Sequence, residues 1–197
     1  MSFAHEDPRS ERSRKAMMSA LLTMMQEQPY NKIKVQDITG VAGLARQTFY
    51  LHYSSKDALL LDYIDDVFDD FYQEAEGIIR TVTGFDPIIP TYVLRQWQKH
   101  KQFSKLVVEA DVEHLIVKRF QNYVTRIIGL YIRSNPGMSI KDPEALKYAV
   151  DYFAGASWMI LRRWLINDCD YPIDRLSALF YDLLVPGLTN LIEGDKW

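Results

Sequence analysis

The stretch Gly40–Lys56, GVAGLARQTFYLHYSSK, decides how the rest of the chain is interpreted. Gly43 permits a tight turn, because glycine adopts backbone angles that other residues avoid. Before this turn, residues 35–42 carry apolar side chains at helical spacing, and after it residues 46–53 form a short polar and aromatic segment. Two short helices joined by a glycine-containing turn form a helix-turn-helix.

The second of these helices begins with side chains that can read DNA. In a helix-turn-helix this end of the helix enters the major groove, where arginine pairs with guanine and glutamine with adenine. Hydroxyl, imidazole and ammonium groups beside it can donate to phosphates. Leu51 either contacts a thymine methyl group or packs inside the protein. The expected DNA-contacting residues are Val35, Arg46, Gln47, Thr48, Tyr50, Leu51, His52 and Lys56.

The sequence from Ile38 to Leu60 closely resembles the DNA-binding domain of TetR/AcrR-type transcriptional regulators. Its core is the pattern Thr-Phe-Tyr-x-His-Tyr/Phe-x-x-Lys-x-x-Leu, at Thr48–Leu59. The resemblance covers about residues 9–62. It implies a three-helix DNA-binding head, a connecting fourth helix and a helical body that binds a ligand and dimerises. It also implies that residues 46–48 and 50–52 face DNA, that Lys56 grips the DNA backbone and that the chain is a dimeric repressor.

Two positions depart from the pattern of that family. Lys34 and Ala45 stand immediately before the two helices of the motif, where the family often has serine, threonine or asparagine. Neither side chain caps a helix well, because neither can accept a hydrogen bond from the free backbone amides. We therefore expect a somewhat less rigid head.

Charge is distributed unevenly along the 197 residues. The net charge is −3, but residues 1–56 contain eight lysines and arginines against five acidic residues, and the remainder contains fifteen against twenty-one. A basic head can meet phosphate groups while an acidic body is repelled from them. Double-stranded DNA is therefore the expected partner.

Composition limits the cellular context. The chain is 48% apolar and has one cysteine, Cys169, so no intrachain disulfide can form. No apolar run approaches the roughly 18 residues that span a bilayer, and the N-terminus lacks the apolar segment of a signal peptide. We expect a cytoplasmic protein without membrane contact.

Helical periodicity extends along the whole chain, so the expected fold class is all-α. We expect a helix-turn-helix domain at residues 1–55 and a regulatory and dimerisation domain at 56–197, in which residues 56–80 are a connecting helix. The other expected helices cover approximately residues 8–27, 35–42, 46–53, 91–110, 112–134 and 143–167, with a final one after Pro172. Pro186 is expected to kink the last helix.

The connecting helix carries aspartates on the side opposite its apolar residues. They are Asp62, Asp65, Asp66, Asp69 and Asp70. A metal site in a helical bundle points inward, whereas this stripe points outward, so we expect a solvated acidic face and no metal.

The body contains candidates for two further sites. An effector pocket is expected among aromatic side chains with polar tips, although such residues are also typical of an ordinary core. The candidates for the pocket are Trp97, His100, Phe103, Tyr123 and Trp158. The last two helices are apolar around most of their surface, which predicts a homodimer through a four-helix bundle. The expected interface residues are Phe153, Gly155, Trp158, Leu161, Leu179, Leu183 and Leu188.

The sequence thus predicts a dimeric regulator that binds a palindromic operator and senses an unknown small-molecule effector. Because one short helix reads few base pairs, two copies are needed for a specific site. The alternative is a regulator or coactivator whose body binds a partner protein. We expect neither enzymatic activity nor a cofactor, since no catalytic arrangement or phosphate-binding loop is present.

Overall fold

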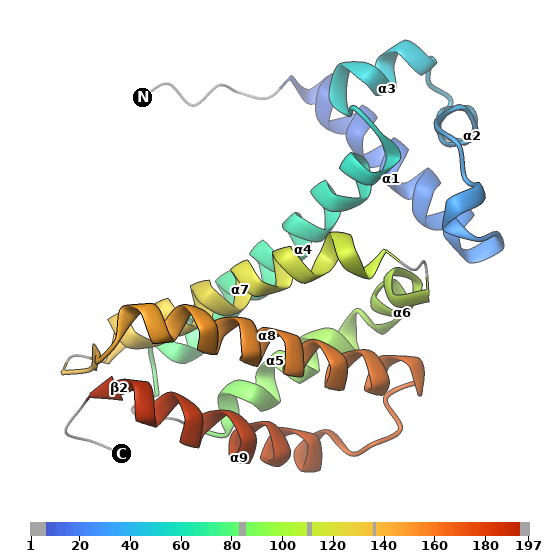
Figure 1. Ribbon diagram of the computed structural model, residues 1–197. Helices are drawn as coiled ribbons and strands as arrows, with labels where there is room; N and C mark the ends of the chain where they lie inside the picture. Colours follow the sequence, from blue (N-terminus) through green and yellow to red (C-terminus); the bar gives the residue numbers. More distant parts are fainter. Residues whose placement is uncertain (1–6, 83–85, 110–111, 136, 194–197) are drawn as a thin grey trace.

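A computed structural model shows a chain built almost entirely of helices, with a small head at one end and a larger body (Figure 1). The structure describes residues 7–82, 86–109, 112–135 and 137–193. The helices are α1 (Pro8–Glu27), α2 (Val35–Val41), α3 (Arg46–His52), α4 (Lys56–Ile79), α5 (Ile88–Lys99), α6 (Lys101–Glu109), α7 (Glu113–Ser134), α8 (Pro143–Ile166) and α9 (Ile173–Leu191), with a short 3-10 helix at Tyr30–Lys32. Two short strands, β1 (Ser139–Ile140) and β2 (Ile192–Glu193), pair antiparallel.

Local capping sets the starts of three of these helices. The side chain of Asp7 accepts a hydrogen bond from the amide of Arg9, and Pro8 occupies the first turn of α1. Ser55 accepts from the amide of Ala58 at the start of α4, and Asp142 opens α8 in the same way. The expected starts of these helices at residues 8, 56 and 143 are confirmed, and each cap satisfies an amide that has no partner within its helix.

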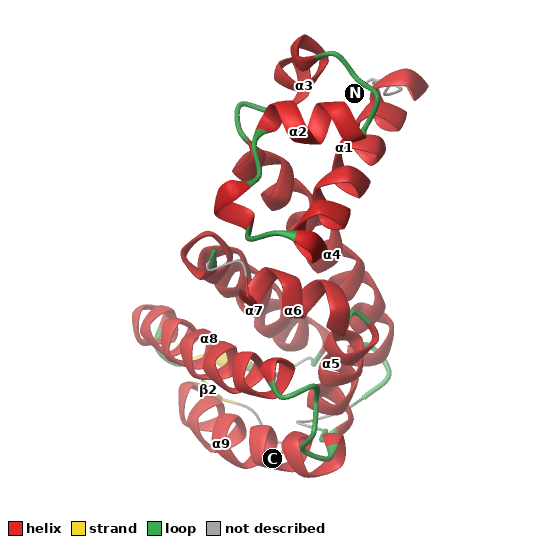
Figure 2. Cartoon of the chain, turned by 90° about the vertical axis from the view of Figure 1, so that its right-hand side faces the viewer, coloured by secondary structure: helices red, strands yellow, loops and turns green. Residues whose placement is uncertain are grey.

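The head consists of α1, α2 and α3, and α4 continues from it into the body. In Figures 1 and 2 the head and α9 lie at opposite ends of the molecule. One continuous hydrophobic core extends from Met17 in α1 through Phe68 in α4 to Phe180 in α9. Because α4 contributes to both parts of this core, a shift of α4 in the body also moves the base of the head.

The body is layered. Helix α4 packs against α7, α7 packs against α8, and α9 closes the far side against α5 and α8. Gly187 brings α9 close to α8, since a Cβ atom at this position would lie 2.8 Å from the ring of Phe153. Hydrogen bonds between β1 and β2 then tie the loop before α8 to the end of α9.

One expectation about the body differs from the structure. The region expected as one helix over residues 91–110 is divided at His100 into α5 and α6. The acidic face of α4 is solvated as expected, since Asp65, Asp66, Asp69 and Asp70 are exposed, but it also forms ion pairs. Asp62 pairs with Arg14, Asp65 with Arg119 and Asp69 with Arg126. The arginines come from α1 and α7, which lie far from these aspartates in the sequence. Within the described residues, no helix is long and apolar enough to span a bilayer.

Candidate nucleic-acid interface and body cavity

The outer surface of α3 presents exposed hydrogen-bond donors. Arg46 and Gln47 lie in its first turn and are exposed, and Thr48 is half-buried beside them. The guanidinium of Arg46 donates to the hydroxyl of Tyr50 at 3.2 Å, which holds both groups on the same face. Leu51 is 82% exposed, so of its two sequence interpretations the structure excludes internal packing.

The turn that presents α3 has the backbone geometry expected for its glycine. Gly43 has φ of +67°, in the left-handed region, and the amide of Leu44 donates to the carbonyl of Thr39 at 2.9 Å. Phe49 is fully buried and anchors α3 from below. A helix of only seven residues is unstable alone, so the burial of Phe49 holds it in place.

The capping of the two motif helices differs between them. At α2 the carboxylate of Asp37 accepts from the amide of Lys34 at 3.0 Å, so this start is supported despite the lysine. At α3 the residue before the helix is Ala45, and no side chain caps the start. As expected, neither Lys34 nor Ala45 accepts a capping hydrogen bond, but Asp37 supports the start of α2.

Lys56 is turned into the protein. Its ammonium group donates to the carbonyl oxygens of Tyr30 and Ile33, at 2.6 and 2.9 Å, and lies 4.3 Å from the centre of the Tyr30 ring. Partial burial lowers its pKa. The hydroxyl of Tyr30 in turn donates to Asp57. Lys56 thus fastens the α1–α2 connection to the start of α4, with two of its three N–H donors bonded to backbone carbonyls.

A second polar cluster fastens α1 to α4. Arg14 donates to the hydroxyl of Tyr53 at 3.0 Å and to the carboxylate of Asp62 at 2.7 Å, and Tyr53 donates to Asp62 at 2.7 Å. We call Arg14, Tyr53 and Asp62 the head clasp. It links the first helix, the residue after α3 and the connecting helix, and so sets the direction in which α3 points.

The remaining predicted DNA-contacting residues lie at the edges of this surface. Val35 is half-buried and packs against the core, and His52 is half-buried at the end of α3. Val41, the last residue of α2, is 60% exposed, whereas Ala42 packs on the core.

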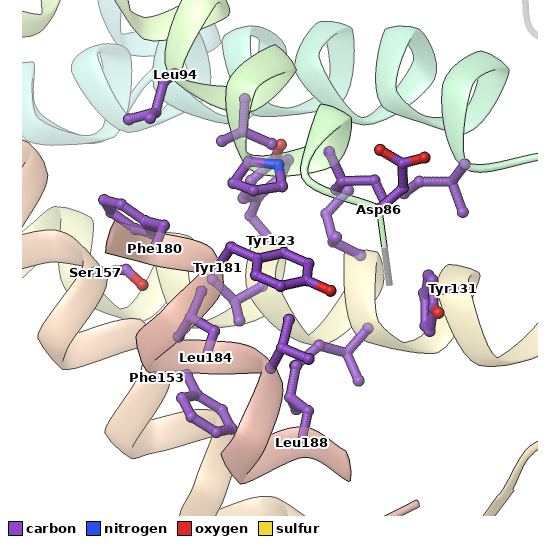
Figure 3. A pocket seen from close by; sticks show the side chains of 18 of the residues that line it. Asp86, Leu94, Tyr123, Tyr131, Phe153, Ser157, Phe180, Tyr181, Leu184 and Leu188 are labelled. Atoms are coloured by element: carbon purple, nitrogen blue, oxygen red, sulfur yellow. The ribbon is translucent and has the colours of Figure 1, made fainter. Parts of the chain in front are cut away.

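A cavity of about 160 Å³ lies in the body between α5, α7, α8 and α9 (Figure 3). Most of its lining is aliphatic or aromatic, and the polar members are one carboxylate and four hydroxyl groups. The described lining residues are Ile79, Asp86, Ile89, Pro90, Val93, Leu94, Phe120, Tyr123, Val124, Ile127, Ile128, Tyr131, Phe153, Ser157, Leu161, Phe180, Tyr181, Leu184, Val185, Leu188 and Ile192.

The five residues expected to line a pocket lie in different places. Tyr123 lines the cavity. Trp97 and Trp158 pack against each other and against Phe120 in the core, with ring centroids 5.7–6.2 Å apart. His100 packs on the ring of Phe71. The side chain of Phe103 lies outside the described part of the structure.

The residues expected at the dimer interface also lie in different environments. Phe153, Trp158, Leu161 and Leu188 are buried within the chain, and three of them line the cavity. Leu179 and Leu183 are exposed on α9, and Gly155 has open space at the position of a Cβ atom.

We define the outer stripe as the apolar residues exposed on α8 and α9. They are Tyr148, Tyr152, Met159, Ile166, Leu179 and Leu183.

The described residues contain no group of three or more histidine, cysteine, aspartate or glutamate side chains arranged to hold a metal ion. The acidic side chains of α4 instead pair with arginines, as described above.

Sequence signals did not separate the cavity residues from the core. Ile127, Phe180 and Leu184 line the cavity with the same kind of side chain that fills the surrounding core. A periodicity of apolar residues predicts which side of a helix is buried, but not where the packing leaves space. No signal in the sequence could have identified these residues as cavity lining.

Family models match both parts of the chain. Residues 18–63 match the model described as bacterial regulatory proteins, tetR family. Residues 90–185 match a model described as a transcriptional regulator C-terminal region. Together they include α3, the second half of α1 and most of the cavity lining.

Individual relatives agree in fold. The fatty acid metabolism regulator protein of Bacillus subtilis (strain 168) is 20% identical over 183 residues, which cover 88% of this chain and 94% of the relative. The dihydroxyacetone kinase operon activator DhaS has a solved structure that is 19% identical with a TM-score of 0.60, over 92% of this chain and 98% of DhaS.

A third similar structure is the transcriptional regulator FadR of Bacillus subtilis, in complex with stearoyl-CoA. It is 20% identical with a TM-score of 0.60, over 88% of this chain and 98% of FadR. At these identities the structures show a shared fold, and the two family models agree with it over most of the chain. The chain belongs to the TetR family of transcriptional regulators.

Proposed function

We propose that the chain is a dimeric repressor that reads a palindromic operator through α3 and releases it when an effector occupies the body cavity. The observation that carries this proposal is the exposed face of α3. Arg46 and Gln47 stand at the end of the helix that enters a major groove, and Tyr50 and Leu51 extend the same surface. Their exposure within a folded head leaves them available to bases and phosphates.

The outer stripe supports the dimer. Exposed apolar side chains recur at positions 148, 152, 159 and 166 of α8, which places them along one side of the helix. Leu179 and Leu183 are separated by one turn on α9. A twofold pairing of these two helices would bury the stripe in a four-helix bundle. Gly155 lies within the stripe and allows the partner helix to approach closely.

The arrangement of α4 and α7 supports a route from the cavity to the head. Phe120, Tyr123 and Ile127 of α7 line the cavity, and the rings of Phe120 and Tyr123 also pack on Phe68 of α4. Ion pairs between Asp65 and Arg119 and between Asp69 and Arg126 connect the two helices. An effector that binds two states of the body unequally shifts the equilibrium between them. The resulting displacement of α4 changes the spacing of the two heads.

A mobility-shift titration with the DNA upstream of the chain's own coding sequence tests the proposal. We expect a palindrome-dependent complex, and we expect Arg46→Ala to weaken it by about 1–3 kcal/mol through loss of one base contact. The matched control is Lys147→Ala, which removes an exposed cation from the body. An operator complex that survives Arg46→Ala with unchanged affinity would contradict the assignment of α3.

The direction of control needs a separate measurement, because one relative of similar fold, DhaS, is described as an operon activator. A reporter gene placed behind the operator should be expressed more strongly when the gene for this chain is deleted. Lower expression in the deletion strain would instead support the activator interpretation, in which the body recruits a partner protein.

A further inference from the structure

The size of the cavity limits what it can hold. Its volume of about 160 Å³ is close to that of apolar protein cavities of about 150 Å³ that bind one benzene molecule. A single aromatic ring or a short aliphatic chain therefore fits among the described lining residues. A long fatty acyl chain is several times larger, so it would extend beyond this space or require the surrounding helices to move apart.

The charge of the lining limits the ligand further. Among the described residues that surround the cavity there is no lysine, arginine or histidine, and the one charged side chain is Asp86. An anion placed there would lose its hydration without gaining a cationic partner, and the carboxylate would repel it. Arg126 of α7 does not supply this cation, because it lies over the ring of Tyr72 and pairs with Asp69.

The cavity nevertheless offers hydrogen bonds at one end. In Figure 3 Asp86 and Tyr131 lie on one side of the cavity, and Leu94 and Phe180 lie toward the other side. Burial raises the pKa of Tyr131, so its phenol stays protonated and neutral. A neutral phenol can both donate and accept. It can therefore orient an uncharged ligand by one polar group.

We infer that the cavity selects a small, uncharged and largely apolar molecule with one hydrogen-bonding group, about the size of a single aromatic ring, and rejects fatty acyl-CoA. The inference rests on the proposed function, since it names the effector class of the same cavity. It separates this chain from the FadR of similar fold, whose structure holds stearoyl-CoA. The phosphates of such a ligand are favoured by arginine or lysine contacts, which the described lining does not provide.

Thermal unfolding with defined probes tests the ligand class. Benzyl alcohol, indole and 1-hexanol are the uncharged probes, benzoate is the charged match to benzyl alcohol, and lauroyl-CoA is the long anionic probe. For the uncharged probes at about ten times the dissociation constant, we expect a rise in Tm of about 3–5 °C. Benzoate and lauroyl-CoA should leave the Tm unchanged.

Two variants show whether binding occurs in this cavity. Val124→Phe fills space in the lining and should abolish the Tm shift with the uncharged probes. Asp86→Asn keeps the shape of the side chain and its ability to cap α5, where Asp86 accepts from the amide of Ile88. We expect Asp86→Asn to improve benzoate binding and to leave benzyl alcohol binding unchanged. Circular dichroism spectra of both variants report whether they fold.

Operator binding measured in the same samples separates the inference from the proposed function. Operator release by an uncharged probe, and not by lauroyl-CoA, supports both. A chain that binds operator but responds only to lauroyl-CoA keeps the proposed function and overturns the inference. The inference is likewise overturned if none of the uncharged probes raises the Tm. If no specific operator complex forms, the proposed function fails and the Tm shifts alone decide the ligand class.

Discussion

Two glycines within helices of the body have opposite surroundings. A Cβ atom on Gly187 of α9 would lie 2.8 Å from the ring of Phe153, whereas a Cβ atom on Gly155 of α8 would meet nothing within 4 Å. Gly187 therefore sets the distance between α8 and α9 within one chain. Gly155 lies on the outer stripe, where only a second chain could approach it.

These surroundings predict different results for the same substitution. Both alanine variants gain about 1 kcal/mol of helix propensity, so their difference reports the packing alone. We expect Gly187→Ala to be less stable than Gly155→Ala by about 1–3 kcal/mol, because the added methyl group overpacks the ring of Phe153. Chemical denaturation of both variants measures this difference.

A double variant provides the control. Phe153→Leu removes the ring that the added methyl group meets, so the cost of Gly187→Ala should be smaller in a Phe153→Leu background. An equal cost in both backgrounds would show that the strain lies elsewhere.

At the scale of elements, the head clasp determines how α1 and α4 meet. The pKa of Tyr53 is raised to about 12, first because the phenol is buried and next because it donates to Asp62. The ordinary pKa of tyrosine is about 10. The pKa of Tyr53 in the folded state therefore lies above its pKa in the unfolded state. The resulting stabilisation is therefore complete below pH 10 and is lost as the pH rises toward 12.

The raised pKa of Tyr53 gives a prediction for the Tyr53→Phe variant. Near neutral pH we expect it to be less stable than the parent chain by about 1 kcal/mol, through loss of one hydrogen bond. The difference should shrink between about pH 10 and 12, as the parent loses the contribution of the clasp. Denaturation curves across this range measure the effect. Tyr50→Phe is the control for removal of a tyrosine hydroxyl outside the clasp, because Tyr50 is exposed on α3.

At the scale of the whole molecule, the proposed function makes DNA recognition depend on a second copy that covers the outer stripe. If α8 and α9 form the interface, replacing Met159 or Leu183 with aspartate places an unpaired charge in a buried apolar contact. We expect both variants to be monomers at micromolar concentration and to lose palindrome-dependent binding while keeping their helical content. Light scattering and mobility shift measure the two properties.

The matched control for these variants is Ile88→Asp on α5. Ile88 is 48% exposed and Met159 is 59% exposed, but Ile88 lies outside the stripe. This control should remain dimeric and bind operator. If Met159→Asp and Leu183→Asp also remain dimeric, the interface lies on another surface.

The sequence alone determined where most of the helices begin and end and which segment forms the helix-turn-helix. Asp7, Ser55 and Asp142 cap helices through hydrogen bonds to amides two or three residues away, and Gly43 supplies the turn by its own backbone freedom. These effects act between neighbours in the chain, so a sequence pattern is enough to predict them.

Only the tertiary structure decided which way side chains point when several partners compete for them. Helix α8 is apolar around most of its surface, so periodicity could not show that Trp158 faces the core while Met159 faces outward. Lys56 donates to backbone carbonyls within the head, and aspartates of α4 pair with arginines on α1 and α7. The cavity exists because side chains from α5, α7, α8 and α9 do not fill the space between them. Each outcome depends on residues distant in sequence, whose positions are fixed only when the whole chain packs.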